Sequence, residues 1–319
     1  MLKPRVAVVR GGQSNEYEVS MKTGASVLQS LAKRHYQAKD IVITRQGEWL
    51  DGGKVRDPER TLTGIDTVFI ALHGEHGEDG RVQRFLSHHH MPYTGSRALG
   101  SSFALNKMFT KNVASKHGIR TPRSLLITRD TPTLLAADIE RELGETVVVK
   151  PASCGSSVDT HVAITAAAAA DVVETLLDRY VAVLVEEYIA GKEVTVGLLE
   201  QFRGEVHYML PVIEIVPPAE QAFYSYDAKY GGQSRYECPG RVSRNELREL
   251  YDITKNIHLL LDLRHYSRAD FLIRDGEVYF LEVNTLPGLT EHSLFPKGLQ
   301  AVGASYEDLV EHLVAMAHY

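Results

Sequence analysis

The sequence is poor in cysteine, carries no excess of positive charge and contains no long apolar run. Its 319 residues include only two cysteines, Cys154 and Cys238, which we interpret as thiols of a reducing compartment rather than as a disulfide framework. The 35 basic residues against 41 acidic residues leave a formal charge of −6, which excludes a basic field for binding nucleic acid. No apolar run approaches about 18 residues, and the N-terminal stretch turns polar too soon for a signal peptide. We therefore expect a cytoplasmic protein without a nucleic-acid or membrane partner.

The order of the expected elements predicts an α/β protein of two or three domains, because the chain is about twice the usual length of one domain. In the first segment, residues 5–10 predict a strand, and Ser14 or Asn15 is expected to cap the helix that follows. Further strands are expected at residues 40–44 and 67–72. Together these segments predict a small parallel sheet covered by helices.

The rest of the chain continues to alternate between helical and extended patterns. Helices are expected at residues 133–143, 166–177, 244–261 and 305–317, strands at residues 146–150, 160–164, 183–189 and 193–199, and a hairpin at residues 269–283. Residues 217–240 are rich in proline, tyrosine and glycine and lack any period. We interpret this stretch as a long loop of the kind that often forms a lid over an active site.

The hairpin carries the clearest chemical signal. Alternate residues of a strand share a face, so Glu282 and Asn284 point the same way, and Asp270 on the preceding strand can join them. Two carboxylates and an amide are oxygen donors that suit Mg²⁺, which also takes phosphate oxygens and water. The alternative is an exposed edge hairpin whose acids are simply solvated.

The convergence of these donors depends on the register of the hairpin. A regular two-residue turn at Asp275-Gly276 would set Asp270 against Leu281 and send Glu282 to the other face. The carboxylates converge only if the loop has an odd number of residues or if a bulge lies between a tight turn and the site.

A second candidate site follows the strand that ends at Lys150. Gly155, Ser156 and Ser157 can bring backbone N–H groups and hydroxyls close to a phosphate, while Lys150 adds a positive charge. The lysine precedes the glycine, so this is not the G-x-x-x-x-G-K-[ST] loop. The alternative is an ordinary glycine-serine turn.

A third run ends in acids at Glu186 and Glu187, followed by Ile189 and Glu193. These carboxylates suit ribose hydroxyls and the backbone suits adenine, although a charged strand end is the plain alternative.

In the first segment, the loop at residues 73–80 lies where ligands bind in such sheets, beyond the carboxyl end of a strand. Its histidines lack the spacing of a zinc site, and a flexible turn remains possible. The dinucleotide fingerprint G-x-G-x-x-G is absent from the first turn, which disfavours a dehydrogenase.

Five segments, taken in order along nearly the whole chain, resemble the D-alanine–D-alanine ligases of the ATP-grasp superfamily. They are GGQSNEYEVS (11–20), FIALHGEHGEDG (69–80), VVKPASCGSSV (148–158), YSYDAKY (224–230) and RADFLIRDGEVYFLEVNTLPGLTEHSL (268–294). The resemblance implies an N-terminal Rossmann-like (preATP-grasp) parallel-sheet domain at residues 1–100, which binds substrate. A two-part ATP-grasp fold would follow, with a central subdomain at 101–190 and a C-terminal subdomain at 191–319 that carries the lid.

The resemblance also implies a reaction: ATP phosphorylates one D-alanine, and a second D-alanine captures the acyl phosphate to form D-alanyl-D-alanine for peptidoglycan synthesis. Two Mg²⁺ ions, or Mn²⁺, would lie on the three hairpin donors, and a homodimer is expected. The implied ATP-binding residues are Lys107, Lys150, Ser156, Ser157, Glu186, Glu187, Ile189, Glu193 and Lys229.

For the amino-acid substrates, the resemblance implies that Glu16 holds the first ammonium group, with His73 nearby, and that Arg268 stabilises the oxyanion. Ser156 and Tyr230 would tie the lid across the closed site together with Glu16. The second carboxylate would bind at Gly288, Ser293 and Leu294.

Two positions depart from the family pattern. Cys154 stands where many relatives carry an acid, and Val158-Asp159 replaces a valine-glycine, which should stiffen the end of the loop. The competing functions are a ligase that uses D-lactate or D-serine as second substrate and, from another class, a nucleotide-binding module without turnover.

Overall fold

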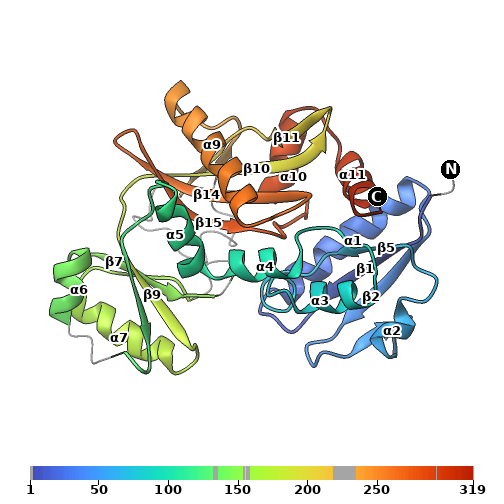
Figure 1. The fold of residues 1–319 in the computed structure, drawn as a ribbon, viewed down its shortest axis with the longest axis horizontal. Helices are drawn as coiled ribbons and strands as arrows, with labels where there is room; N and C mark the ends of the chain where they lie inside the picture. Colours follow the sequence, from blue (N-terminus) through green and yellow to red (C-terminus); the bar gives the residue numbers. More distant parts are fainter. Residues whose placement is uncertain are drawn as a thin grey trace.

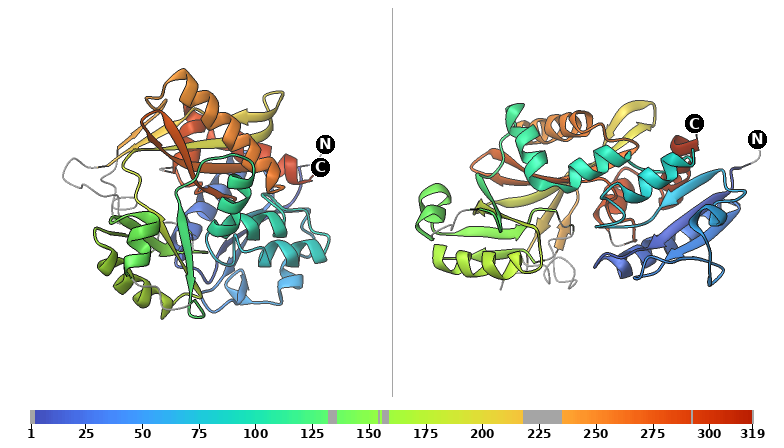
Figure 2. Two further views of the ribbon diagram at one scale, coloured as in Figure 1. Left: turned by 60° about the vertical axis from the view of Figure 1, so that its left-hand side comes forward. Right: turned by 60° about the horizontal axis from the view of Figure 1, so that its bottom comes forward.

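The computed structural model describes residues 3–131, 136–153, 155, 159–217, 235–291 and 293–318. Three β-sheets organise these residues (Figure 1). In the views of Figures 1 and 2, the first sheet (blue) and the middle sheet (green) lie below opposite ends of the third sheet (yellow and orange). Within the described part of the chain, no helix is long and apolar enough to cross a bilayer.

The first sheet has a parallel centre and an antiparallel edge. Its strands, in spatial order, are β4 (Lys54–Val55), β3 (Trp49–Asp51), β2 (Ala38–Ile43), β1 (Val6–Gly11) and β5 (Thr67–Ile70). β1 pairs in parallel with both β2 and β5, which confirms the expected parallel strands. The β3–β4 hairpin pairs antiparallel at the edge and was not expected from the sequence. The sheet is therefore mixed rather than purely parallel.

Helices cover this sheet, and one of them comes from the far end of the chain. They are α1 (Tyr17–Lys33), α2 (Pro58–Thr61), α3 (Arg81–His88) and α11 (Tyr306–His318). The expected cap of α1 was wrong, because Glu16 occupies the N-cap without a side-chain hydrogen bond. Ser14 instead donates to the carbonyl oxygen of His73 at 2.7 Å. α11 packs on α1, where Lys33 pairs with Glu307 at 2.8 Å, so both ends of the chain belong to one packed unit.

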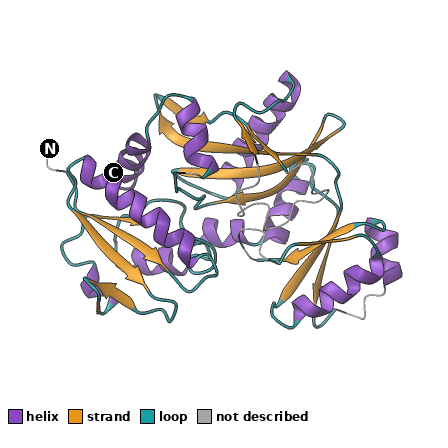
Figure 3. Ribbon diagram, turned by 180° about the vertical axis from the view of Figure 1, so that it is seen from behind, coloured by secondary structure: helices purple, strands orange, loops and turns teal. Residues whose placement is uncertain are grey.

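The middle sheet is antiparallel. Its strands, in spatial order, are β6 (Ser124–Thr128), β9 (Ala182–Glu187), β7 (Val147–Pro151) and β8 (His161–Ala163). The helices α6 (Ala136–Leu143) and α7 (Ala166–Leu177) cover the face that is turned away from the rest of the molecule (Figure 3). The alanine-rich run is a helix, as expected, and Thr165 caps it by accepting from the N–H of Ala168.

Two consecutive helices, α4 (Ala98–Leu105) and α5 (Lys107–Lys116), connect the first sheet to the middle sheet. Asn106 ends α4 and caps α5, because its side chain accepts from the N–H of Phe109. The N–H of Lys107 donates to the carbonyl oxygen of Ala152 at 3.0 Å, just after β7. This bond fixes the start of α5 beside the strand that carries Lys150.

The third sheet is the largest. Its strands, in spatial order, are β13 (Arg235–Glu237), β12 (Ile213–Val216), β10 (Lys192–Phe202), β14 (Tyr266–Arg274) and β15 (Glu277–Asn284), and β11 (Glu205–Met209) also pairs with β10. The helix α9 (Arg244–Leu260) packs on this sheet and begins with a capping box formed by Ser243 and Glu246. The short helix α10 (Leu294–Ala301) follows the hairpin.

The β14–β15 hairpin combines a tight turn with a bulge. Asp275 and Gly276 both have positive φ, at 54° and 79°, as a two-residue primed turn requires. The register pairs Arg274 with Glu277 and then shifts, so that Asp270 lies opposite Glu282. The bulge therefore brings the two carboxylates to one face. A tight turn followed by a bulge is one of the two geometries expected from the sequence.

The strands of the three sheets fall within residues 1–100, 101–190 and 191–319, respectively. The division of the chain into domains at these boundaries stays a prediction.

Candidate active site

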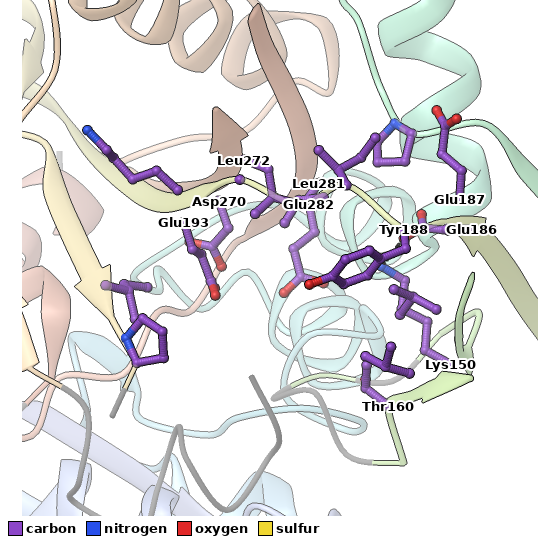
Figure 4. A pocket seen from close by; sticks show the side chains of 18 of the residues that line it. Lys150, Thr160, Glu186, Glu187, Tyr188, Glu193, Asp270, Leu272, Leu281 and Glu282 are labelled. Carbon is purple, nitrogen blue, oxygen red and sulfur yellow. Dashed lines mark ion pairs between the residues drawn. The ribbon is translucent and has the colours of Figure 1, made fainter. Parts of the chain in front are cut away.

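A cavity of about 350 Å³ lies between the middle sheet and the third sheet (Figure 4). Its volume is in the range of small-molecule sites in proteins. Both apolar and charged side chains line it. The apolar group includes Val148, Val162, Ile189, Ile215, Leu272 and Leu281, and the charged group includes Lys107, Lys150, Glu186, Glu193, Asp270 and Glu282.

Asp270 accepts hydrogen bonds from three neighbouring side chains. Its side chain is buried, and Arg268 donates to both of its oxygens, at 3.0 and 2.8 Å. The hydroxyl of Thr195 donates to the same carboxylate at 2.6 Å, and the side-chain amide of Asn284 donates at 3.1 Å. The structure thus brings Asp270 and Asn284 together, as expected from their places in the hairpin, and it adds Arg268 as a partner of Asp270.

Glu282 lies across from Asp270 and forms an ion pair with Lys107 at 3.0 Å. In Figure 4 the carboxylates of Glu193, Asp270 and Glu282 point into the same space. No three histidine, cysteine or acidic side chains of the described residues form a metal cluster. Two carboxylates and an amide nevertheless fit Mg²⁺, because this ion usually keeps several waters and completes its shell with substrate phosphate oxygens.

Three buried charges form a cluster beside this space. Glu186 pairs with Lys111 through one oxygen and with Lys150 through the other, each at 2.6 Å. Burial alone would raise the pKa of Glu186, but the two lysines outweigh it and lower the pKa to about 2. Glu186 is therefore ionised. Burial lowers the pKa of Lys111 against the attraction of Glu186, and Lys150, which lines the cavity, is the lysine placed to meet a phosphate.

Lys111 was not predicted from the sequence. It lies four residues after Lys107 on α5, so both lysines project from one face of the helix. That spacing was the available signal. Its partner Glu186 lies 75 residues away, and no local pattern links the two residues.

The predicted nucleotide contacts differ in their surroundings. Glu187 accepts from the N–H and the side chain of Arg123, each at 2.8 Å, and its carboxylate points away from Asp270 in Figure 4. Ile189 is buried, and both Ile189 and Glu193 line the cavity. The cavity lining thus includes all of these residues, while the carboxylate of Glu187 is engaged elsewhere.

His73 is buried at the junction between the first sheet and the loop after β15. Its Nδ1 donates to the carbonyl oxygen of Leu286 at 2.9 Å, and its Nε2 lies 2.8 Å from the hydroxyl of Thr23. Burial lowers the pKa of His73 to about 4. A neutral imidazole therefore joins two segments that the sequence predicted to bind substrate.

Glu16 lies between two glycine loops. A Cβ atom added at Gly74 would lie 2.4 Å from Oε2 of Glu16, and one added at Gly155 would lie 2.7 Å from it. Gly74 also has a φ of +66°, so this position favours glycine for two reasons. The close approach places the predicted ammonium-binding carboxylate directly against the loop that follows Lys150.

A further acid, Glu78, holds the same region together. Its buried carboxylate accepts from the N–H of Gly74 at 3.1 Å and from three donors of Thr285 and Leu286 at 3.1 to 3.2 Å. Burial raises the pKa of Glu78 against the effect of these bonds. The sequence places Glu78 in a candidate loop, but its partners about 207 residues away could not be inferred.

Gly288, Ser293 and Leu294 meet at the start of α10. The hydroxyl of Ser293 lies 2.8 Å from that of Thr290 and accepts from the N–H of Thr290 at 3.0 Å. A Cβ atom at Gly288 would lie 2.9 Å from this hydroxyl, so glycine allows the turn to close on Ser293. The three residues predicted to bind the second carboxylate are therefore neighbours.

Five of the residues singled out from the sequence, Cys154, Ser156, Ser157, Lys229 and Tyr230, lie outside the described residues. Asp159, at the end of the same loop, has a φ of +54°. Its carboxylate accepts from the hydroxyl of Tyr180 and pairs with Arg179 at 3.0 Å. A side chain thus anchors the end of this loop.

Two family models cover most of the chain. The model of the D-Ala–D-Ala ligase C-terminus matches residues 113–315, and that of the N-terminus matches residues 5–61 and 51–96. The chain belongs to the D-alanine–D-alanine ligase family. The family and the α/β fold expected from the motifs are thereby confirmed.

Individual members of the D-alanine–D-alanine ligase family match over nearly the full length. The D-alanine–D-alanine ligase of Syntrophotalea carbinolica is 38% identical over 314 residues, which cover 98% of this chain and 96% of that protein. The enzyme of Cupriavidus necator is also 38% identical, with coverages of 98% and 91%.

Solved structures of the family share the fold of this chain. The D-alanine–D-alanine ligase of Bacillus anthracis complexed with ATP superposes with a TM-score of 0.83 at 28% identity, and the match covers 99% of this chain and 97% of that one. The VanG D-Ala:D-Ser ligase of Enterococcus faecalis superposes with a TM-score of 0.84 at 26% identity and covers 99% of both chains.

Proposed function

We propose that this protein joins two molecules of D-alanine to D-alanyl-D-alanine with ATP, as a step in making peptidoglycan precursors. The observation that carries the proposal is that Asp270, Glu282 and two lysines line one cavity together with apolar side chains, while Asn284 donates to Asp270. This arrangement suits a nucleotide whose ring lies among the apolar side chains and whose phosphates meet the lysines.

In the first step, a carboxylate oxygen of one D-alanine attacks the γ-phosphorus of ATP, and the bond to the leaving ADP oxygen breaks. Lys107 and Lys150 would hold the phosphates, because both lysines line the cavity. Asp270, Glu282 and Asn284 would hold Mg²⁺ or Mn²⁺. When bound, such ions neutralise charge that builds on the transferred phosphoryl group.

In the second step, the amine of the other D-alanine attacks the carbonyl carbon of D-alanyl phosphate, and phosphate leaves as the amide forms. Arg268 would stabilise the oxyanion of the tetrahedral intermediate, since Asp270 holds its guanidinium at the edge of the site. The amine loses a proton in this step.

The amino-acid sites follow from the first sheet and from α10. Glu16 would bind the ammonium group of the first D-alanine, near His73, while Gly288, Ser293 and Leu294 would bind the carboxylate of the second. Ser156, Tyr230 and Lys229, outside the described residues, would contribute the loop and lid that keep water from the acyl phosphate. The use of ATP fits a cytoplasmic protein.

The test is release of ADP and phosphate with D-alanine alone, compared with D-alanine plus D-serine, D-lactate or L-alanine. We expect one ADP for each D-alanyl-D-alanine with D-alanine alone, and no increase from the other compounds. A depsipeptide product, or D-alanyl-D-serine formed in preference to D-alanyl-D-alanine, would contradict the proposed second substrate. ATP binding without any amide product would contradict turnover altogether.

We also propose a homodimer. On α4 and α5, the rings of Phe103 and Phe109 stack at 4.4 Å, and both are exposed together with Leu99. Exposed apolar residues on adjacent helices favour contact with a second copy. Sedimentation equilibrium should give twice the mass of the chain, and a Phe103→Glu variant should give the mass of one chain. A monomeric wild-type protein at micromolar concentration would contradict this proposal.

A further inference from the structure

One helix, α5, delivers lysines to two different sheets. Lys107 reaches Glu282 on β15 of the third sheet at 3.0 Å, and Lys111, one turn later, reaches Glu186 on β9 of the middle sheet at 2.6 Å. Both lysine side chains are buried. Burial of a charged lysine is costly unless a partner compensates its charge, so each of these two lysines depends on the carboxylate that it contacts.

Only one of these two lysines lines the cavity. Lys107, Lys150 and Glu186 line it, whereas Lys111 is not among the residues that form its wall. The side chain of Lys111 is 3% exposed, and it contacts the Glu186 oxygen that Lys150 does not contact. Lys111 therefore meets Glu186 rather than the space that a nucleotide would fill.

Glu186 divides its carboxylate between two cations. One oxygen contacts Lys111 and the other contacts Lys150, so the carboxylate holds the Lys150 ammonium at the cavity wall. Burial lowers the pKa of Lys111, and the neighbouring carboxylate of Glu186 opposes this effect. With Lys111 protonated, the three side chains sum to a charge of +1, whereas Lys150 and Glu186 without Lys111 sum to zero.

We infer that Lys111 is a positioning residue for the nucleotide, acting through Glu186. It compensates the buried carboxylate so that the charge of Lys150 remains available to the phosphates. The identity of the ligand, MgATP, rests on the proposed function. The inference concerns binding alone, so it can be tested without D-alanine.

The test is a double-mutant cycle on MgATP binding, measured by titration calorimetry of the full chain in the absence of D-alanine. The variants are Lys111→Met, Glu186→Gln and the two combined, with Lys116→Met as the matched control from an exposed position of the same helix. We expect Lys111→Met to raise the dissociation constant about tenfold or more, the size of coupling seen in buried pairs. In the combined variant no carboxylate is left for Lys111 to compensate, so it should bind within about threefold of Glu186→Gln, and Lys116→Met should bind like wild type.

Additive losses in the combined variant would overturn the inference, because a merely structural lysine would weaken binding whether or not the carboxylate is present. If Lys111→Met does not fold, the comparison of the combined variant with Glu186→Gln alone decides the question. Steady-state kinetics add a second readout: the KM for ATP should rise in Lys111→Met while the KM for D-alanine changes less than about twofold. Lys111→Arg should recover part of the affinity. Wild-type protein that binds MgATP but forms no dipeptide would contradict the proposed function and leave this inference standing.

Discussion

Acid should destabilise this protein through two buried histidines, His73 and His265. Burial lowers the pKa of each to about 4 from the ordinary 6.5, and Arg264 adds to the effect at His265. Each imidazole makes hydrogen bonds as a neutral ring: Nδ1 of His73 donates to Leu286, and Nδ1 of His265 accepts from the N–H of Gly95. Both histidines thus join the first sheet to the third sheet or its loops in their uncharged form.

The direction in which pH changes the free energy of unfolding follows from proton binding in the folded and unfolded states. Between pH 6.5 and 4 the unfolded chain binds a proton at each histidine and the folded chain does not, so the free energy of unfolding falls as the pH falls. At 1.36 kcal/mol per pKa unit, the full loss is about 3 kcal/mol for each histidine, of which about 2 kcal/mol is lost between pH 7 and pH 5. The stability that they contribute is fully present above about pH 7.

The assay is urea denaturation at steps between pH 8 and pH 4.5 for wild type, His73→Gln and His265→Gln. Each variant should be less stable than wild type at pH 7.5, but should lose about 2 kcal/mol less on going from pH 7 to pH 5. His88→Gln, at an exposed position at the end of α3, serves as the control and should follow wild type. Equal losses in wild type and in both buried variants would refute the reasoning.

Four other substitutions test the site. Glu282→Gln and Asn284→Ala should each lower ADP formation by about 10² to 10³-fold while the chain still folds, because several kcal/mol of charge stabilisation depends on the ions that they would hold; near-normal ADP release at saturating Mg²⁺ would contradict this. Gly155→Ala should raise the KM for D-alanine several-fold, because its methyl group would lie 2.7 Å from the carboxylate of Glu16. Glu78→Gln should lower the free energy of unfolding by about 2 kcal/mol, because an amide replaces an acceptor of backbone donors; a stability equal to wild type would count against the hydrogen bonds described.

The hairpin shows how far sequence reasoning reaches. The tight Asp275-Gly276 turn and the need for Asp270 and Glu282 to share a face leave few geometries, and the bulge at Asp270/Phe271 is one of them. In a hairpin, the length of the turn decides which residues of the two strands lie opposite each other, so their pairing can be worked out from residue numbers alone. Helices with clear periodicity, such as residues 166–177, were also predicted correctly for local reasons.

What the sequence missed depends on contacts between distant segments. The cap of α1 was wrong because Ser14 bonds to the carbonyl of His73, which lies 59 residues away. Lys111 and Glu78 were given no role because their partners lie 75 and about 207 residues away. The β3–β4 hairpin was missed because its strands are only three and two residues long, too short for an alternating pattern.

The central claim is that the carboxylate of D-alanine attacks the γ-phosphate. The most direct test uses D-alanine labelled with ¹⁸O in both carboxylate oxygens and follows the released phosphate by ³¹P NMR. The account predicts that each phosphate formed with D-alanyl-D-alanine carries one ¹⁸O atom, since the acyl phosphate breaks between carbon and oxygen. Unlabelled phosphate, or label found in AMP, would contradict it.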